Sequence, residues 1–194
     1  MTGVQTCALP ISAADPRNVR ALLIGAEVQQ ASGNVDAAEA LAQAALSISP
    51  NDTEAAGFLA AASLARGRLD EALARAEAVL ARSPRAPRAL EVAALARAQK
   101  GDRAGARRAF ESLLELEPDG WAHLNNFALF EMEGGDPRAA ARLFHQAVSI
   151  NSGNVQGYRG LAEAARALRD PELARRAESA LGRLRADVQN PENP

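Results

Sequence analysis

Cysteine, aromatic residues and lysine are all scarce in this chain. Cys7 is the only cysteine among 194 residues, so no disulfide can form within the chain and cysteine usage does not reveal its redox compartment. Aromatic residues make up 4% of the sequence, and Lys100 is the only lysine among 22 basic residues. Because alanine and leucine supply most of the apolar content, we expect stacked helices with shallow local cores.

Large charge imbalances and long apolar runs are also missing. The formal net charge is −2, so no bulk electrostatic attraction to nucleic acid or anionic lipid is expected. No apolar run approaches the roughly 18 residues that a membrane-spanning helix needs. We therefore expect neither nucleic-acid binding nor direct membrane insertion.

Residues that carry catalysis or bind metals are few and scattered. The two histidines, His123 and His145, stand apart from other ligand-type residues, and we interpret them as partly exposed helix residues. The Gly134-Gly135-Asp136 stretch lacks the spaced glycines and the Lys-Ser/Thr pair of a phosphate-binding loop. The sequence therefore predicts no catalytic residue, no cofactor and no metal site, and we expect the chain not to be an enzyme.

A strict internal period of 34 residues dominates what is present. Several residue classes keep this spacing: Gly33, Gly67, Gly101 and Gly135; Pro50, Pro84 and Pro118; Ala26, Ala60, Ala94, Ala128 and Ala162; Ala38, Ala72, Ala106, Ala140 and Ala174. A period of this length with small residues, a glycine turn and a closing proline is typical of stacked helix–turn–helix units.

The residues between these markers predict two helices in each unit. Apolar residues recur at helical spacing, for example in 53–66 and 70–82. Each glycine is expected to end the first helix with a positive φ. Four polar residues are expected to cap the second helices, namely Asn34, Asp102, Asp136 and Asp170. The alanines at two fixed places allow close helix approach.

These units resemble tetratricopeptide repeats. The segment from Gly33 to Asp52 reads almost as that family's consensus for a second helix and its exit turn. The departures lie in the large residues: the family's aromatic at the eleventh place is Gln29, Ser63, Arg97, Glu131 and Ala165 here. The resemblance implies an all-α, right-handed α-solenoid of stacked antiparallel helix pairs, and the Ala/Arg bias suggests a bacterial source.

The period sets the expected domain organisation. We assign repeats to 19–52, 53–86, 87–120, 121–154 and 155–186, the last including a C-terminal cap, with 187–194 as a tail and 15–18 as the exit turn of an upstream repeat. Residues 1–14 are expected to be an artefact outside the fold. Residues 1–11 resemble a translated sequencing adapter, and they directly precede half of a repeat.

The resemblance also implies a binding surface. In the family, the first helices line a concave groove that receives a peptide or a partner helix. Carried over by position, the richest cluster of candidate groove residues is Arg88, Glu91, Leu95, Asn125, Asn126, Leu129, Met132, Arg159 and Glu163. Asparagines can hydrogen-bond a peptide backbone, and arginines can pair with carboxylates.

We therefore expect a non-catalytic scaffold that binds an extended peptide or a partner helix. Two alternatives stay open. One is a regulatory segment of a larger enzyme of kinase, glycosyltransferase or cytochrome-maturation type, truncated at its N-terminus. The other is an assembly subunit for secretion, pilus formation or exopolysaccharide export. Weak self-association through the truncated N-terminal end is a further expectation, and the sequence does not place the chain in the bacterial cytoplasm or the periplasm.

Deleting residues 1–14 tests whether this segment belongs to the fold. We expect the thermal unfolding midpoint to stay within about 2–4 °C of the full chain, because a shift of that size corresponds to roughly 1 kcal/mol for a domain of this length. A larger fall, measured by circular dichroism on both proteins, would show that the segment packs against the repeats.

Overall fold

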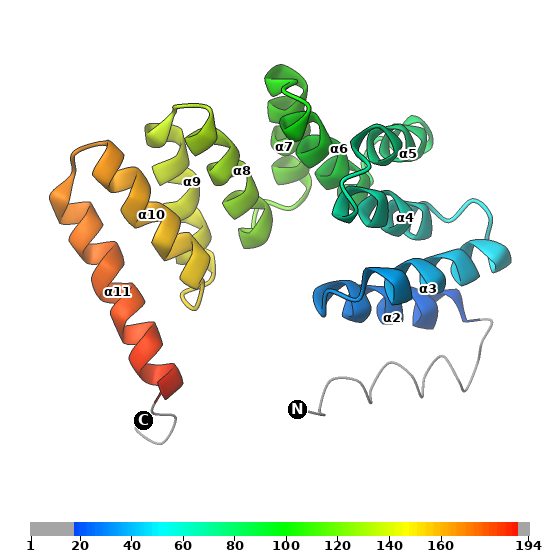
Figure 1. Cartoon of the computed structure of the whole chain (residues 1–194), viewed down its shortest axis with the longest axis horizontal. Coiled ribbons are helices and arrows are strands. Elements are labelled where there is room, and N and C mark those ends of the chain that lie inside the picture. The colour runs from blue at the N-terminus through cyan, green and yellow to red at the C-terminus, as the bar shows by residue number, and fades with distance from the viewer. Residues whose placement is uncertain (1–17, 190–194) are drawn as a thin grey trace. The chain divides into compact units, whose positions relative to one another are not determined.

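A computed structural model of the chain describes residues 18–189, and side chains up to residue 185. This part of the chain holds ten helices and no strand (Figure 1): α2 Val19–Ala31, α3 Val35–Ile48, α4 Thr53–Ala65, α5 Leu69–Arg82, α6 Pro87–Gln99, α7 Arg103–Leu116, α8 Trp121–Glu133, α9 Pro137–Ile150, α10 Val155–Ala167 and α11 Pro171–Gln189. The all-α prediction is confirmed. The adapter-like residues 1–11, and the rest of the segment up to residue 17, lie outside the described residues.

The chain divides into two compact units. Unit 1 ends at Leu113 and unit 2 begins at Leu114, so the division falls inside α7. Within unit 1 the first helices of successive pairs, α2, α4 and α6, are neighbours, and α3 and α5 each pack on the first helix that follows. Within unit 2, α8 and α10 are neighbours in the same way, and α9 packs on α10. Each unit therefore presents a layer of first helices.

The turns inside the helix pairs follow the predicted chemistry. Gly33, Gly67, Gly101 and Gly135 have φ between 71° and 81°. In the first of these turns the backbone N–H of Gly33 donates to the Gln30 carbonyl, and that of Asn34 donates to the Gln29 carbonyl. These bonds satisfy carbonyls that the end of α2 would otherwise leave open. Arg169 occupies the equivalent place in the last pair with φ 58°, a conformation that costs more with a side chain.

The predicted caps of the second helices are confirmed at three of four positions. Carboxylate oxygens of Asp102, Asp136 and Asp170 accept from the backbone N–H three residues further on, at 2.9, 2.9 and 3.0 Å. The prediction for Asn34 is wrong. Its side chain makes no cap bond, because its amide nitrogen donates to Oε1 of Gln29 at 2.9 Å instead.

Three first helices carry caps that the sequence interpretation did not include. Side-chain oxygens of Asn18, Asp52 and Asn154 accept from backbone N–H groups in the first turns of α2, α4 and α10, at 3.0, 2.8 and 2.8 Å. Asp52 and Asn154 also close the exit turn of the preceding helix pair. The exit turns therefore start the next helix as well as ending the last one.

The periodic alanines are buried in the cores. All ten periodic alanines are at most 7% exposed, and Ala26, Ala60, Ala94, Ala106 and Ala128 are fully buried. Larger side chains fill the space between pairs, with Phe58 in a cluster of unit 1 and Phe144 in a cluster of unit 2. Gly160 on α10 makes room for Phe144, since a Cβ there would clash with the ring. Small residues thus set the helix spacing in both units.

Replacing a buried alanine of α7 tests the repeat register. Ala106 is fully buried, so Ala106→Leu should overpack the helix crossing and cost on the order of 1–3 kcal/mol. Ala104 lies exposed on the same helix, and Ala104→Leu makes the identical change in solvent, where the expected effect is within about 0.5 kcal/mol. Urea unfolding of the two variants measures the difference, and equal midpoints would show that the register is wrong.

Candidate functional site

The predicted groove residues fall on three first helices. Arg88, Glu91 and Leu95 lie on α6 in unit 1, and all three are partly buried. The remaining residues lie in unit 2, on two neighbouring helices: Asn125, Asn126, Leu129 and Met132 on α8, and Arg159 and Glu163 on α10. The nine residues thus form two sets, one in each unit.

Arg88 already has partners inside unit 1. The carbon at the centre of its guanidinium lies 3.7 Å from the centroid of the Phe58 ring on α4. One guanidinium nitrogen donates to Oε1 of Gln30 on α2 at 3.2 Å. Gly57 lets the stem of Arg88 approach, because a Cβ there would lie 3.2 Å from Cδ of Arg88. The side chain therefore connects three successive first helices through a cation–π contact and a hydrogen bond.

This geometry changes the role expected for Arg88. Its Nε is buried and has no hydrogen-bond partner, and its guanidinium face is covered by Phe58. A carboxylate ligand would have to displace contacts that unit 1 already uses. Arg88 therefore holds the first-helix layer of unit 1 together, and the exposed part of the candidate surface lies in unit 2.

Asn125 is buried in unit 2. It is 1% exposed, and its amide nitrogen donates to Oδ1 of Asn154 at 3.0 Å, while the amide nitrogen of Asn154 donates back to Oδ1 of Asn125 at 3.1 Å. Asn154 also caps α10. The amide predicted to hold a peptide backbone thus joins α8 to the start of α10. The sequence alone did not reveal this contact. In a sequence, two asparagines that are buried against each other cannot be told from two asparagines on the surface.

The exposed remainder of the predicted surface is a short mixed stripe. Leu129 is 37% exposed on α8, and Arg159 and Glu163 are exposed one turn apart on α10. Asn126 and Met132 are partly buried beside Leu129 on α8, and Met132 packs against the core. We call these five residues the inner stripe of unit 2. It offers one apolar contact and two charges of opposite sign on adjacent helices.

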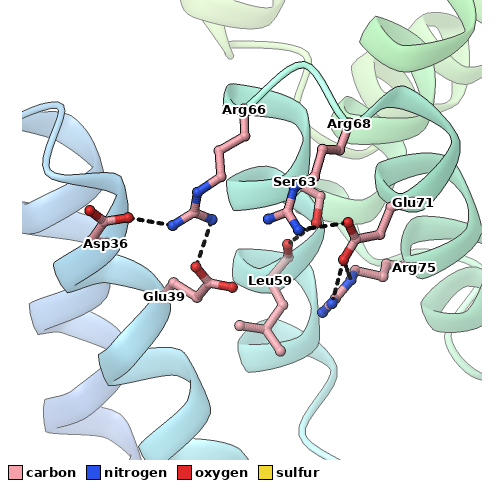
Figure 2. Close-up of polar contacts among 8 residues, drawn as sticks. All are labelled: Asp36, Glu39, Leu59, Ser63, Arg66, Arg68, Glu71 and Arg75. Atoms are coloured by element: carbon pink, nitrogen blue, oxygen red, sulfur yellow. Dashed lines mark hydrogen bonds and ion pairs between the residues drawn. The ribbon is translucent and has the colours of Figure 1, made fainter.

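Ion pairs link successive helix pairs in unit 1. Arg66, at the end of α4, reaches Asp36 and Glu39 on α3, with N–O distances of 2.5 and 2.6 Å (Figure 2). Hydrogen bonds to Asp36 first, and then to Glu39, raise the pKa of Arg66 above its ordinary value. One period later Lys100, at the end of α6, pairs with Asp70 on α5. The signal was present in the sequence as an acid and a base 30 residues apart, repeated at the 34-residue period.

Glu71 is the centre of a second polar group within one helix pair. Its carboxylate accepts from Arg68 at 2.9 Å and from Arg75 at 2.6 Å, and it lies beside the hydroxyl of Ser63 on α4 (Figure 2). The hydrogen bond from Arg75 is the main cause that lowers the pKa of Glu71 below its ordinary value. These contacts are partly exposed to solvent, so they orient the helices more than they stabilise the fold.

Sequence and structure comparisons identify the family. Models of tetratricopeptide repeats match residues 29–97 and, with a second model, residues 91–137 and 125–191. The chain belongs to the tetratricopeptide repeat family. It is an all-α helical repeat solenoid, as predicted. No curated protein sequence matches the chain.

Solved structures of other proteins have the same fold. TTC0263 of Thermus thermophilus is 22% identical, with a TM-score of 0.71 over 90% of this chain and 93% of that one. PilW, described as a type IV pilus biogenesis factor, is 22% identical, with a TM-score of 0.71 over 96% and 84%. YrrB, described as having an unusual peptide-binding site, is 12% identical, with a TM-score of 0.61 over 93% of both chains. At these identities the likeness shows the fold alone.

The eleventh place of the repeat is polar in the first four repeats, where the family usually has an aromatic residue. Gln29 accepts from Asn34 in its own turn, and Ser63 bonds the Leu59 carbonyl and Glu71 within its own repeat. Arg97 instead donates to Glu77 on α5 of the preceding repeat, at 2.8 Å. Polar bonds therefore replace part of the packing that a ring would supply.

The described part of the chain contains neither a cluster of metal ligands nor a membrane-spanning helix. Between residues 18 and 189, no three His, Cys, Asp or Glu side chains are placed to share a metal ion. Over the same residues, each helix is too short or too polar to span a bilayer.

The buried amide pair gives a stability prediction for this tetratricopeptide repeat chain. Asn125→Ala leaves the buried amide of Asn154 without its partner, which should cost about 1–3 kcal/mol. Gln146→Ala removes an exposed amide from α9, and its effect should stay within about 0.5 kcal/mol. Urea unfolding measures both changes. If Asn125→Ala were as mild as Gln146→Ala, the pair would contribute nothing to the junction of α8 and α10.

Proposed function

We propose that this chain is a non-catalytic scaffold that binds an extended peptide or a partner helix on the first-helix layer of unit 2. The observation that carries the proposal is the inner stripe. Leu129 is exposed on α8, and the charges Arg159 and Glu163 are exposed on the neighbouring helix α10. Two adjacent helices thus offer an apolar anchor and both signs of charge to one ligand.

The chemistry of the stripe suits a peptide. A leucine that becomes buried on binding contributes on the order of 1–2 kcal/mol, and an arginine can hold a carboxylate through two parallel hydrogen bonds. Arg159 and Glu163 form no hydrogen bond or ion pair with another residue in the described range. Both charges are therefore available to a ligand at little cost in existing contacts.

The family context supports a scaffold. Tetratricopeptide repeat proteins are generally non-catalytic scaffolds for protein partners, and YrrB is described as having a peptide-binding site. The unit 1 layer has a different role in this proposal. Because Arg88 binds Phe58 and Gln30, that layer serves as a support rather than as the main contact surface.

Selection from a displayed library of random peptides tests the proposal. Peptides selected on the full chain should bind a Leu129→Ser, Arg159→Glu double variant at least about tenfold more weakly, since that change removes the apolar anchor and reverses one charge. Binding is measured by fluorescence anisotropy with one synthetic peptide from the selection.

A matched double variant controls for the chemistry of the change. Ile48→Ser with Arg108→Glu makes comparable substitutions at exposed positions of unit 1, and its affinity should equal that of the unchanged chain. Selected peptides that bind both double variants equally well would show that the inner stripe is not the binding surface.

A further inference from the structure

Helices α9, α10 and α11 form a hollow in unit 2. Its volume is about 330 Å³. The floor is apolar, with buried Val148, Leu161, Ala177 and Ala180 and partly buried Tyr158 and Leu173. The rim is polar, formed by His145, Ser149, Arg176 and Arg183. We call this hollow the outer cleft.

The outer cleft lies on a different face of α10 from the inner stripe. Tyr158 and Leu161 line the cleft, whereas Arg159 and Glu163 belong to the stripe. At 3.6 residues per turn these two pairs point to directions more than about 100° apart around the helix axis. A ligand in the cleft would therefore touch a surface that the proposed peptide-binding function does not use.

The cleft lies in the most basic part of the chain. Between residues 138 and 185 there are nine arginines and four carboxylates, which leaves a formal charge of +5, while the whole chain carries −2. All nine arginines are exposed. The low overall charge conceals this local excess, because residues 1–137 carry a formal charge of −5 and residues 186–194 a charge of −2.

The nearby carboxylates neutralise only part of the rim. Asp170 caps α11, Glu172 pairs with Arg176, and Glu178 pairs with Arg166 on α10. Arg183 donates to the hydroxyl of Ser179 at 3.2 Å and pairs with no carboxylate among the side chains that the structure describes, which end at residue 185. Among these side chains its charge is uncompensated, at the edge of an apolar floor.

The basic rim continues outward along α11. A shallow hollow of about 420 Å³ next to the cleft shares Arg176 and Arg183 with it, and adds Arg175, Ser179 and Glu172. The two hollows together offer an apolar floor and then a row of arginines. Such a row fits several carboxylates along one chain better than a single small anion.

We propose that the outer cleft binds an acidic segment of a protein partner. One or two apolar side chains of that segment fill the floor between Leu161 and Ala177. Its carboxylates pair with Arg183 and share Arg176 with Glu172. The apolar floor favours a peptide over a bare phosphate, and the local basic excess, with Arg183 at the rim, favours an acidic peptide over a neutral one. The proposal adds a second partner surface to the scaffold and does not depend on the inner stripe.

The experiment uses three fluorescent peptides of about twelve residues in amphipathic helical patterns. The first has glutamate at its polar positions and leucine at its apolar ones; the second replaces glutamate by lysine; the third replaces leucine by serine. The full chain should bind the first at least about tenfold more tightly than either other peptide at physiological salt. Tyr158 is the only tyrosine, so the rate of its nitration, followed by mass spectrometry, reports whether the cleft is occupied.

Two charge-reversed variants make the test specific. Arg176→Glu with Arg183→Glu alters the rim, and should weaken binding of the acidic peptide about tenfold or more and abolish protection of Tyr158. Arg138→Glu with Arg142→Glu makes the same change in charge on exposed positions of α9 that do not line the cleft. That control should keep its affinity within about threefold, and circular dichroism confirms that both variants fold.

Four outcomes would overturn the proposal. Equal weakening in both variants would show attraction to the general basic field. Binding that leaves Tyr158 unprotected would place the peptide elsewhere. Vesicles containing phosphatidylserine, and single-stranded DNA, serve as competitors of the peptide. If either displaced the labelled peptide at a lower concentration than unlabelled peptide does, the cleft would be assigned to another anion. Concentration-dependent association that protects Tyr158 and that the peptide does not disrupt would show that a second copy occupies it.

The inner stripe provides an independent check. The Leu129→Ser, Arg159→Glu variant should bind the acidic peptide and protect Tyr158 as the unchanged chain does. The two proposals can therefore fail independently of each other. Each surface has its own double variant, and only the outer cleft has Tyr158 as a reporter. Loss of Tyr158 protection in the stripe variant would contradict the separation of the two surfaces.

Discussion

Close approach of helices at buried alanines is the contact on which the rest of this structure depends. Two alanines recur in every 34-residue window, and all ten are buried. A side chain of one carbon brings the backbones of neighbouring helices close, and it leaves room for only a few large residues such as Phe58 and Phe144 between pairs. Aromatic content can therefore be low without leaving the cores unfilled. The glycine turns and the aspartate caps follow from the same constraint, because helices packed this tightly have to begin and end at fixed residues.

Thin apolar packing gives polar contacts a larger share of the connections between helices. In unit 1, Arg66 and Lys100 each join the end of a first helix to the second helix of the preceding pair, and Arg88 spans three first helices through Phe58 and Gln30. In unit 2 a buried pair of asparagines joins α8 to the start of α10. The exposed ion pairs contribute little to stability, since water screens them, whereas the buried amide pair is costly to break. Orientation of the helices and stability of the fold thus rest on different residues.

Charge is distributed unevenly along a chain that is almost neutral overall. The basic excess between residues 138 and 185 surrounds an apolar cleft, and the inner stripe of unit 2 carries one charge of each sign. A scaffold gains selectivity from such differences, because a surface of one sign attracts one class of segment and repels the other. Two chemically distinct faces on the same three or four helices would let one small unit hold two partners. The helical repeat provides the framework, and the surface residues that vary between repeats determine which partner segment binds.

The sequence by itself determined the repeat period, the helix pairs, the turns and the family, because each depends on local rules: a glycine with positive φ, a carboxylate before a helix, an apolar residue at every third or fourth place. It also determined which residues occupy the first-helix positions. Only the tertiary structure decided which of them a ligand can reach. Asn125 and Arg88 occupy groove positions by register, yet one is buried against Asn154 and the other is stacked on Phe58. The outer cleft was likewise invisible in the sequence, since its residues come from three helices. Exposure and partnership depend on what a neighbouring repeat places opposite a side chain, and no local pattern contains that information.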